Sequence, residues 1–216
     1  MRLLIAFLLT VFTAVPFPAK AEQEISLYVG VQNAPDSTVK GREPNGASFN
    51  FDAGWEGKSL SPPFYYGIRY ANWFDDNNAW SINFTHLKTY ADHKTLSSSG
   101  FSALQFTHGL NPFTVNWMHR FGSGSGFQPY AGLGAGVAIP HVEIQSPSMV
   151  KKTYKYQYGG PAIDFMGGMR YSMSNQWSLF AEYSFHYVKV DVDMGGGNLR
   201  TNIKTNALNV GVNYAF

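Results

Sequence analysis

Cysteine is absent from this sequence of 216 residues. The protein therefore has no disulfide framework and no metal site built from thiolates. Charged residues are scarce, and after residue 21 there is no run of about 18 consecutive apolar residues, so we expect no transmembrane helix. The formal net charge is only +2. This near balance argues against nucleic acid as a partner, because nucleic-acid-binding domains carry a clear basic excess.

Residues 1–21 have the features of a secretory signal peptide. Arg2 supplies a positive start, residues 3–15 form a short apolar core, and Ala19-Lys20-Ala21 matches an A-x-A cleavage site. The alternative, a retained membrane anchor, is disfavoured because the apolar core is shorter than the ~20 residues of a spanning helix. We predict one domain, residues 22–216, which has no formal net charge once Arg2 and Lys20 are removed.

Glycine and aromatic residues are abundant, with 22 glycines and 16% Phe, Trp and Tyr. This mixture is typical of membrane-spanning β-barrels, which carry aromatic belts at both interfaces. In the stretch 206–216, Leu208, Val210 and Val212 fall on one face of a strand, and Asn209 and Gly211 on the other. A soluble, lipocalin-like barrel of eight strands alternates too, but it does not explain outward-facing Tyr and Trp.

Seven further stretches alternate in the same way, and no helical periodicity competes with them. The eight predicted strands are 24–33, 65–73, 80–90, 113–121, 127–140, 162–173, 177–191 and 206–216. The sequence therefore predicts an all-β fold: an eight-stranded antiparallel transmembrane β-barrel of the bacterial outer membrane. A closed barrel leaves no free sheet edge, so we expect a monomer.

The predicted connections alternate in length. The short ones are 75–79, 122–126 and 174–176; the long, polar ones are 33–64, 91–112, 141–157 and 192–205. Short periplasmic turns and four long outer loops match the habit of outer-membrane barrels. An even number of crossings then excludes a ninth candidate, Ser48–Ser59, which we place in the first outer loop as an extension of a hairpin above the membrane.

Several charged side chains point into the predicted barrel. If 174–176 is the turn, Asp164 lies opposite His186 and Gly168 opposite Glu182, and Arg69 also faces inward. A carboxylate beside an imidazole is the arrangement needed for a general base or a metal ligand. The alternative is a salt-bridged plug that stabilises the lumen, since buried charges are usually paired for structural reasons. Arg120 and Arg170, near the periplasmic end, are interpreted as structural.

Other ionisable residues gather near the outer ends of the strands. Strict alternation points His86 and His141 outward, whereas a bulge at Thr85 or Pro140 would turn them inward, and both arrangements stay open. In a chain without cysteine, a bound metal would use histidine and carboxylate ligands. The basic and tyrosine-rich stretch 151–158 is either a binding surface for a phosphorylated glycolipid or a simple strand extension.

Nucleotide-binding and hydrolase motifs do not appear. Gly132, Gly134 and Gly136 lack the G-x-G-x-x-G spacing and a following helix, and the sequence has neither a P-loop nor a G-x-S-x-G elbow. No flavin or nicotinamide motif is readable. If the protein catalyses an oxidation, a bound divalent metal is therefore the default hypothesis for the group that accepts the electrons.

Seven segments resemble the lipid A oxidases, which are eight-stranded outer-membrane barrel enzymes. The segments are GWEGKS (54–59), PPFYYGIR (62–69), FTHLKTYAD (84–92), SGFSALQFTHGLN (99–111), PYAGLGAGVAIPHV (129–142), YKYQYGGPA (154–162) and TNALNVGVNYAF (205–216). The resemblance implies oxygen-dependent oxidation of the proximal glucosamine of lipid A to a 2-aminogluconate unit. It implies lipid A, or lipopolysaccharide, as substrate and outer-membrane lipid as surroundings.

The resemblance and the predicted faces together define two candidate sets of residues. The catalytic candidates are Glu56, Arg69, Asp164, Glu182 and His186, and the metal candidates are His86, Asp92 and His141. Two other readings stay open. Ser184 and His186 on one inward face suggest a lipid A deacylase-like hydrolase, and the long outer loops suit a non-catalytic structural or adhesin-like barrel.

Overall fold

The structure is a computed structural model that describes residues 22–122 and 126–216, so the predicted signal peptide lies outside the described residues. The strands are β1 (Glu22–Arg42), β2 (Ser48–Glu56), β3 (Tyr66–Trp73), β4 (Asn78–His86), β5 (Thr89–Ala91), β6 (Ala103–Phe106), β7 (Pro112–Arg120), β8 (Phe127–Ala138), β9 (His141–Gln145), β10 (Thr153–Tyr156), β11 (Gly160–Ser172), β12 (Trp177–Asp193) and β13 (Asn198–Ala215). A short helix, α2 (His93–Ser99), interrupts them. No helix in these residues is long and apolar enough to cross a membrane.

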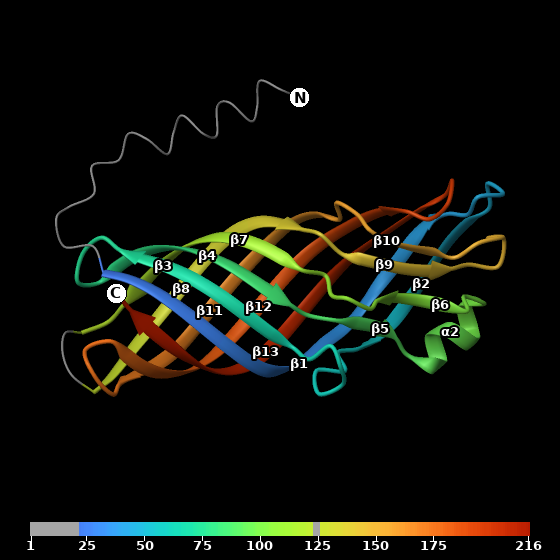
Figure 1. Cartoon of the computed structure of the whole chain (residues 1–216). Helices are drawn as coiled ribbons and strands as arrows, with labels where there is room; N and C mark the ends of the chain where they lie inside the picture. The colour runs from blue at the N-terminus through green and yellow to red at the C-terminus, as the bar shows by residue number, and fades with distance from the viewer. Residues whose placement is uncertain (1–21, 123–125) are drawn as a thin grey trace, which may run out of the picture.

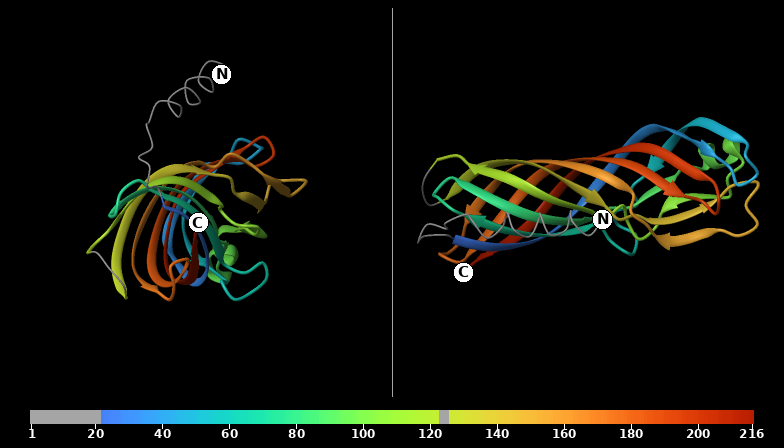
Figure 2. Two further views of the ribbon diagram at one scale, coloured as in Figure 1. Left: turned by 60° about the vertical axis from the view of Figure 1, so that its left-hand side comes forward. Right: turned by 90° about the horizontal axis from the view of Figure 1, so that it is seen from above.

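Eight strands form a closed ring in the order β1-β13-β12-β11-β8-β7-β4-β3, and β3 pairs back with β1. Every pairing in the ring is antiparallel. The start of β1 and the end of β13 lie at the end that carries the short turns, while α2, β5 and β6 lie at the opposite end (Figure 1; Figure 2). The predicted eight-stranded antiparallel barrel is confirmed.

Alternation along the strands sorts side chains between lipid and lumen. On β1, Leu27 and Val29 are about half exposed, whereas Ser26 and Tyr28, which alternate with them, are buried. Because a one-residue slip would exchange the two faces, this pattern also sets the register. The predicted pairing across the β11–β12 turn is confirmed, with Asp164 opposite His186.

The long connections predicted as loops are largely folded into strands. β2 pairs with the outer half of β1, as predicted for a hairpin above the membrane, and β5, β6, β9 and β10 continue the same sheet. The segment 192–205 is not a loop, because β12 and β13 extend through it to a turn at 194–197. β13 has 18 residues, whereas a strand needs about 9–11 to cross a bilayer. We call the part beyond the membrane the outer extension. It consists of β2, β5, β6, β9 and β10, the outer half of β1, and the parts of β12 and β13 between Tyr187 and Lys204.

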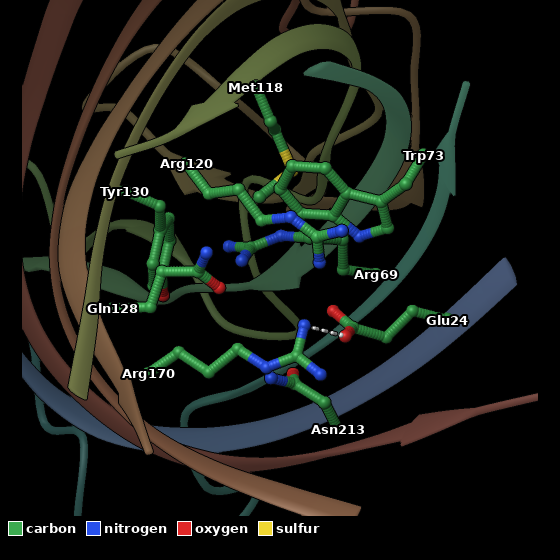
Figure 3. A pocket seen from close by; sticks show the side chains of 9 residues that line it. All are labelled: Glu24, Arg69, Trp73, Met118, Arg120, Gln128, Tyr130, Arg170 and Asn213. Carbon is green, nitrogen blue, oxygen red and sulfur yellow. Dashed lines mark ion pairs between the residues drawn. The ribbon is translucent and has the colours of Figure 1, made fainter. Parts of the chain in front are cut away.

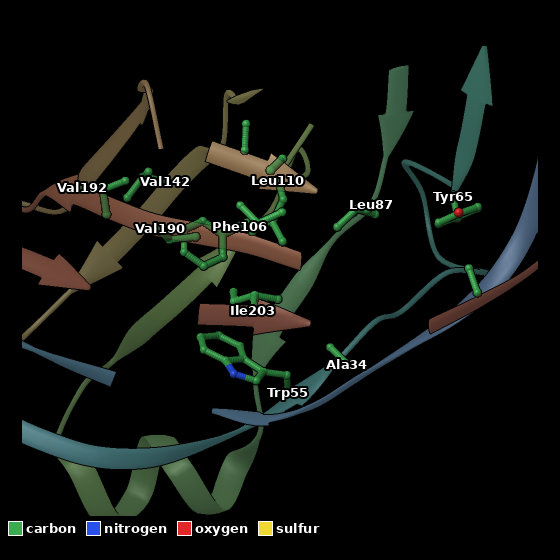
Figure 4. Packing of buried hydrophobic residues seen from close by; sticks show 14 of the residues in the cluster. Ala34, Trp55, Tyr65, Leu87, Phe106, Leu110, Val142, Val190, Val192 and Ile203 are labelled. Carbon is green, nitrogen blue, oxygen red and sulfur yellow. The ribbon is translucent and has the colours of Figure 1, made fainter. Parts of the chain in front are cut away.

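Where the outer extension begins, the inward face of the long strands changes from polar to apolar and the outward face from apolar to polar. Up to His186 the inward residues of β12 are mostly polar, but beyond it Val188, Val190 and Val192 are buried. Ile203 of β13 and Phe106 of β6 are fully buried beside them (Figure 4). The outward residues become polar over the same span. An apolar interior and a polar surface are what a β-structure needs in water, so this exchange marks the outer boundary of the membrane.

Candidate functional site

Inside the barrel, Arg69 on β3 meets Glu182 on β12. Nη2 of Arg69 lies 2.7 and 2.9 Å from the two carboxylate oxygens of Glu182. Tyr130 and Ser184 each donate a hydrogen bond of 2.8 Å to the same carboxylate. The arginine and the glutamate are only 2% and 3% exposed. A buried ion pair whose carboxylate is saturated with donors holds the lumen together, and removing one partner leaves a buried charge unpaired.

Asp164 and His186 form a second buried pair on neighbouring strands. Nδ1 of His186 lies 3.3 Å from Oδ1 of Asp164, an ion-pair distance without hydrogen-bond geometry. The other carboxylate oxygen accepts hydrogen bonds from Asn83 at 3.1 Å and Thr114 at 3.3 Å. Both members of the pair are 2% exposed. Asp164 is therefore anchored to β4 and β7 as well as facing the imidazole.

The lumen holds a small polar cavity near its periplasmic end (Figure 3). Arg69, Arg120 and Arg170 line it, and Nη1 of Arg170 lies 2.7 Å from Glu24. The cavity measures about 10 Å³, room for about one water molecule. A sugar does not fit there.

Four of the five predicted catalytic residues thus lie in the packed lumen, where the cavity beside Arg69 is too small for a sugar. Their arrangement favours the structural alternative, a salt-bridged plug. It also gives the deacylase reading no nucleophile, because the Ser184 hydroxyl donates to Glu182 and not to His186. Neither ring nitrogen of His186 has a hydrogen-bond partner in the described part of the chain.

A different group of ionisable residues lies at the outer rim, the level at which β4 ends and β7 begins. His86, the last residue of β4, stays in register with Tyr66 of β3, without a bulge at Thr85. The rings of His86 and Tyr66 stack with centroids 5.2 Å apart. The imidazole is nevertheless only 6% exposed. Alternation therefore places His86 on the outer face, and the turn 107–111 covers it.

Asn111 fixes this turn to its surroundings. Its Nδ2 donates to the carbonyl oxygens of His108 at 2.8 Å and Ile139 at 3.2 Å, and its Oδ1 lies 3.0 Å from Nδ1 of His86. Its φ of 49° is left-handed, which asparagine tolerates better than most residues. Gly109 also has a positive φ, and a Cβ there would lie 2.8 Å from Nδ1 of His86. The sequence HGLN thus connects the ends of β4, β7 and β8.

His108 and His141 meet beside this turn. Their ring centroids are 4.4 Å apart, and the ring of His141 also contacts Tyr154 and Tyr156 at 4.4 and 4.8 Å. Nδ1 of His141 lies 3.0 Å from Oγ1 of Thr107. The two tyrosines are 54% and 58% exposed on the edge strand β10. We call His86, His108, His141, Tyr154 and Tyr156 the rim cluster.

The rim cluster sits in an electrostatic setting that keeps its central imidazole neutral. Burial and then the charge of His108 lower the pKa of His141 below its ordinary value. Next to it, burial alone would raise the pKa of Glu143, but hydrogen bonds from Lys152 and Gln105 hold it below its usual range. A neutral imidazole is able to accept a proton near neutral pH.

This lowered pKa predicts a pH dependence of stability. The unfolded chain takes up a proton at His141 near pH 6.5, while the folded chain resists protonation until lower pH. Stability is therefore expected to be greatest above pH 6.5 and to fall as the pH drops through the window below it. Thermal unfolding of the wild type and of His141→Asn between about pH 5 and 8 checks this. Parallel pH curves for the two proteins would contradict it.

The remaining predicted site residues lie apart from one another. Glu56 ends β2 and forms a half-exposed ion pair of 3.2 Å with Lys58. Asp92 caps α2 by accepting a hydrogen bond of 2.7 Å from the Thr95 amide. Within residues 22–122 and 126–216, no group of three or more histidine, aspartate or glutamate side chains is arranged to hold a metal. The predicted ligands His86, Asp92 and His141 therefore do not fit a shared metal.

Sequence reasoning left out His108, Asn111 and the two tyrosines of β10 as site residues. A signal for them was available, because HGLN and YKY both lie inside segments that resemble the lipid A oxidases. Alternation alone says nothing about these residues, since they belong to a turn and to an edge strand outside the barrel.

Comparisons with known proteins agree on the class of fold. The sequence matches the family described as Outer membrane protein beta-barrel domain over residues 5–216. Neisserial surface protein A is similar in structure, with a TM-score of 0.52, 13% identity and coverage of 91% of this chain and 99% of that one. AlkL, solved in DMPC lipid bilayers, gives a TM-score of 0.54 at 18% identity, with coverage of 94% and 97%.

OprG of Pseudomonas aeruginosa gives a TM-score of 0.51 at 13% identity, with coverage of 91% of this chain and 95% of that one. At these identities the likeness concerns the fold alone. The comparison with curated protein sequences gives no match. The chain belongs to the outer membrane protein beta-barrel domain family, and it is a protein of the bacterial outer membrane.

Proposed function

We propose that this protein oxidises the proximal glucosamine of lipid A at the rim cluster. The observation that carries the proposal is the meeting of His108 and His141 with two exposed tyrosines on the outer face. This cluster lies where the strands leave the membrane, the level of the sugars of an outer-leaflet glycolipid. The sequence resemblance to lipid A oxidases supports the reaction, and the packed lumen supports a site on the outside.

The proposed reaction balances with dioxygen as oxidant. The substrate is a lipid A whose proximal C1 carries no phosphate, because only a free hemiacetal opens to an aldehyde. The open-chain C1 aldehyde of the glucosamine adds water, forming a C–O bond, and loses two electrons and two protons to become the carboxylic acid. Dioxygen takes up both electrons and both protons and leaves as hydrogen peroxide. The sugar gains one oxygen atom in total.

The residues of the rim cluster have distinct roles in this proposal. His141, held by Thr107 at Nδ1, uses Nε2 to accept the proton released at C1. His108 contacts His141 edge-on and lowers its pKa, which keeps it ready as a base. Tyr154 and Tyr156 offer ring faces and hydroxyl groups to the sugar, and Asn111 positions His86 and the turn.

Mass spectrometry of lipid A from cells with and without the gene tests the function. We expect a lipid A species heavier by one oxygen only in cells that carry the gene and are grown with air. Loss of an acyl chain would instead identify a deacylase. Lipid A that is identical in both strains would overturn both enzymatic functions and leave a structural or adhesin-like barrel.

A further inference from the structure

The outward face of β1, β12 and β13 changes abruptly from apolar to charged and polar at the membrane boundary. On β13 the exposed side chains below the boundary are Leu208, Val210 and Val212, and those above it are Lys204, Asn202 and Arg200. We call this outward face of β1, β12 and β13 the wall. β13 and β7 are four strands apart in the eight-stranded ring, so the wall lies opposite the β7 side of the rim cluster. The reaction proposed above makes no use of it.

The basic side chains of this wall are mostly unpaired. Arg200 forms an ion pair of 2.8 Å with Asp191. Lys40, Lys189 and Lys204 form no ion pair within the described residues. Register brings them together, because Lys40 pairs with Arg200, Lys189 with Asn202, and Lys204 with Tyr187. A recess of about 590 Å³ opens on this wall, and Lys40, Lys189 and Arg200 are among the residues that line it.

An apolar groove lies lower on the same wall, within the membrane. Its volume is about 480 Å³, and its lining includes Leu27, Val29, Val210, Val212 and Leu179. In register these residues form rows across β1, β13 and β12. Because they span the lipid-facing side, hydrocarbon covers them in the membrane.

We propose that this wall is a binding site for a phosphorylated glycolipid of the outer leaflet. The phosphates bind at Lys40, Lys189 and Lys204, and an acyl chain lies in the groove below. Lys40, Lys189, Lys204 and Arg200 share this wall with two carboxylates. Asp191 pairs with Arg200, and Asp52 accepts a hydrogen bond from Thr38. The basic groups outnumber these carboxylates, so a phosphate finds a net positive charge. The strand runs about 20 Å from Lys204 down to Val210. This distance is enough to reach from a lipid head group into the acyl layer.

The test compares lipid retention by purified, folded full-length variants in detergent, using native mass spectrometry. The probes are bisphosphorylated lipid A and the same lipid with both phosphates removed. For the triple variant Lys40→Gln, Lys189→Gln and Lys204→Gln we expect affinity at this wall to fall about fivefold per lysine, on the order of 100-fold in total. The control variant Lys94→Gln, which removes an exposed lysine elsewhere, should bind as the wild type does.

A second variant tests the groove independently of the charges. Val210→Trp fills the groove without touching a lysine, and we expect it to weaken retention of the phosphorylated lipid. Equal retention by the triple variant and the wild type, or equal binding of the dephosphorylated lipid to the wild type, would overturn the head-group site. Unchanged retention by Val210→Trp would overturn the chain groove. Oxidation of lipid A should persist in all these variants, so failure of the proposed reaction stays distinguishable.

Discussion

Replacement of His141 by alanine is expected to lower lipid A oxidation by about 100- to 10,000-fold per folded protein, the range for loss of a general base. The imidazole is neutral near pH 7, because burial and the neighbouring His108 lower its pKa. No other imidazole sits between Thr107 and two exposed tyrosines in the described chain. The rate is measured in vitro as conversion of purified lipid A that lacks the phosphate at C1, followed by mass spectrometry.

His119→Ala is the matched control for this prediction. His119 lies near the periplasmic end of β7, where its Nδ1 is 2.8 Å from Asn78, so its loss should leave oxidation unchanged. His186→Asn distinguishes catalysis at the rim cluster from catalysis by the Asp164–His186 pair in the lumen. If His186→Asn abolishes oxidation while His141→Ala retains it, the chemistry belongs to the lumen pair and the rim proposal is wrong.

Glu182→Leu is expected to destabilise the barrel by about 3–5 kcal/mol, because it leaves the Arg69 guanidinium buried without its partner. Tyr130 and Ser184 also lose their shared acceptor. The free energy of unfolding is measured with urea in phospholipid vesicles. Glu56→Gln is the control: its partner Lys58 is half exposed, so this change should cost about 1 kcal/mol or less.

The double variant Arg69→Met and Glu182→Leu tests the cause of this loss. Once both charges are gone, no buried charge is left unpaired, so most of the lost stability should return. A double variant that is less stable than Glu182→Leu alone would show that the charges do more than compensate each other. Neither change touches the rim cluster, and lipid A oxidation by the folded fraction should persist.

Local alternation allowed much of the barrel to be predicted. Whether a side chain faces lipid or lumen depends on its own strand, as for Leu27 and Tyr28, and a strand carries that information in its neighbours. A short turn also sets register, which is why Asp164 opposite His186 could be predicted. The outer extension could be predicted only in part. Alternation predicts the hairpin of β2 and the strand up to residue 191, whereas the polar residues and three successive glycines that dominate 192–205 indicate a loop.

The class of the protein, its membrane crossings and the faces of its strands follow from the sequence, because alternation and turn length act between near neighbours. The pairing of Glu182 with Arg69 across the lumen and the contact of His108 with His141 at the rim depend on the folded chain. β3 and β12 do not pair, and a turn and an edge strand supply the rim cluster. Such contacts depend on how the whole ring closes and on how the outer extension folds back, which no local pattern encodes.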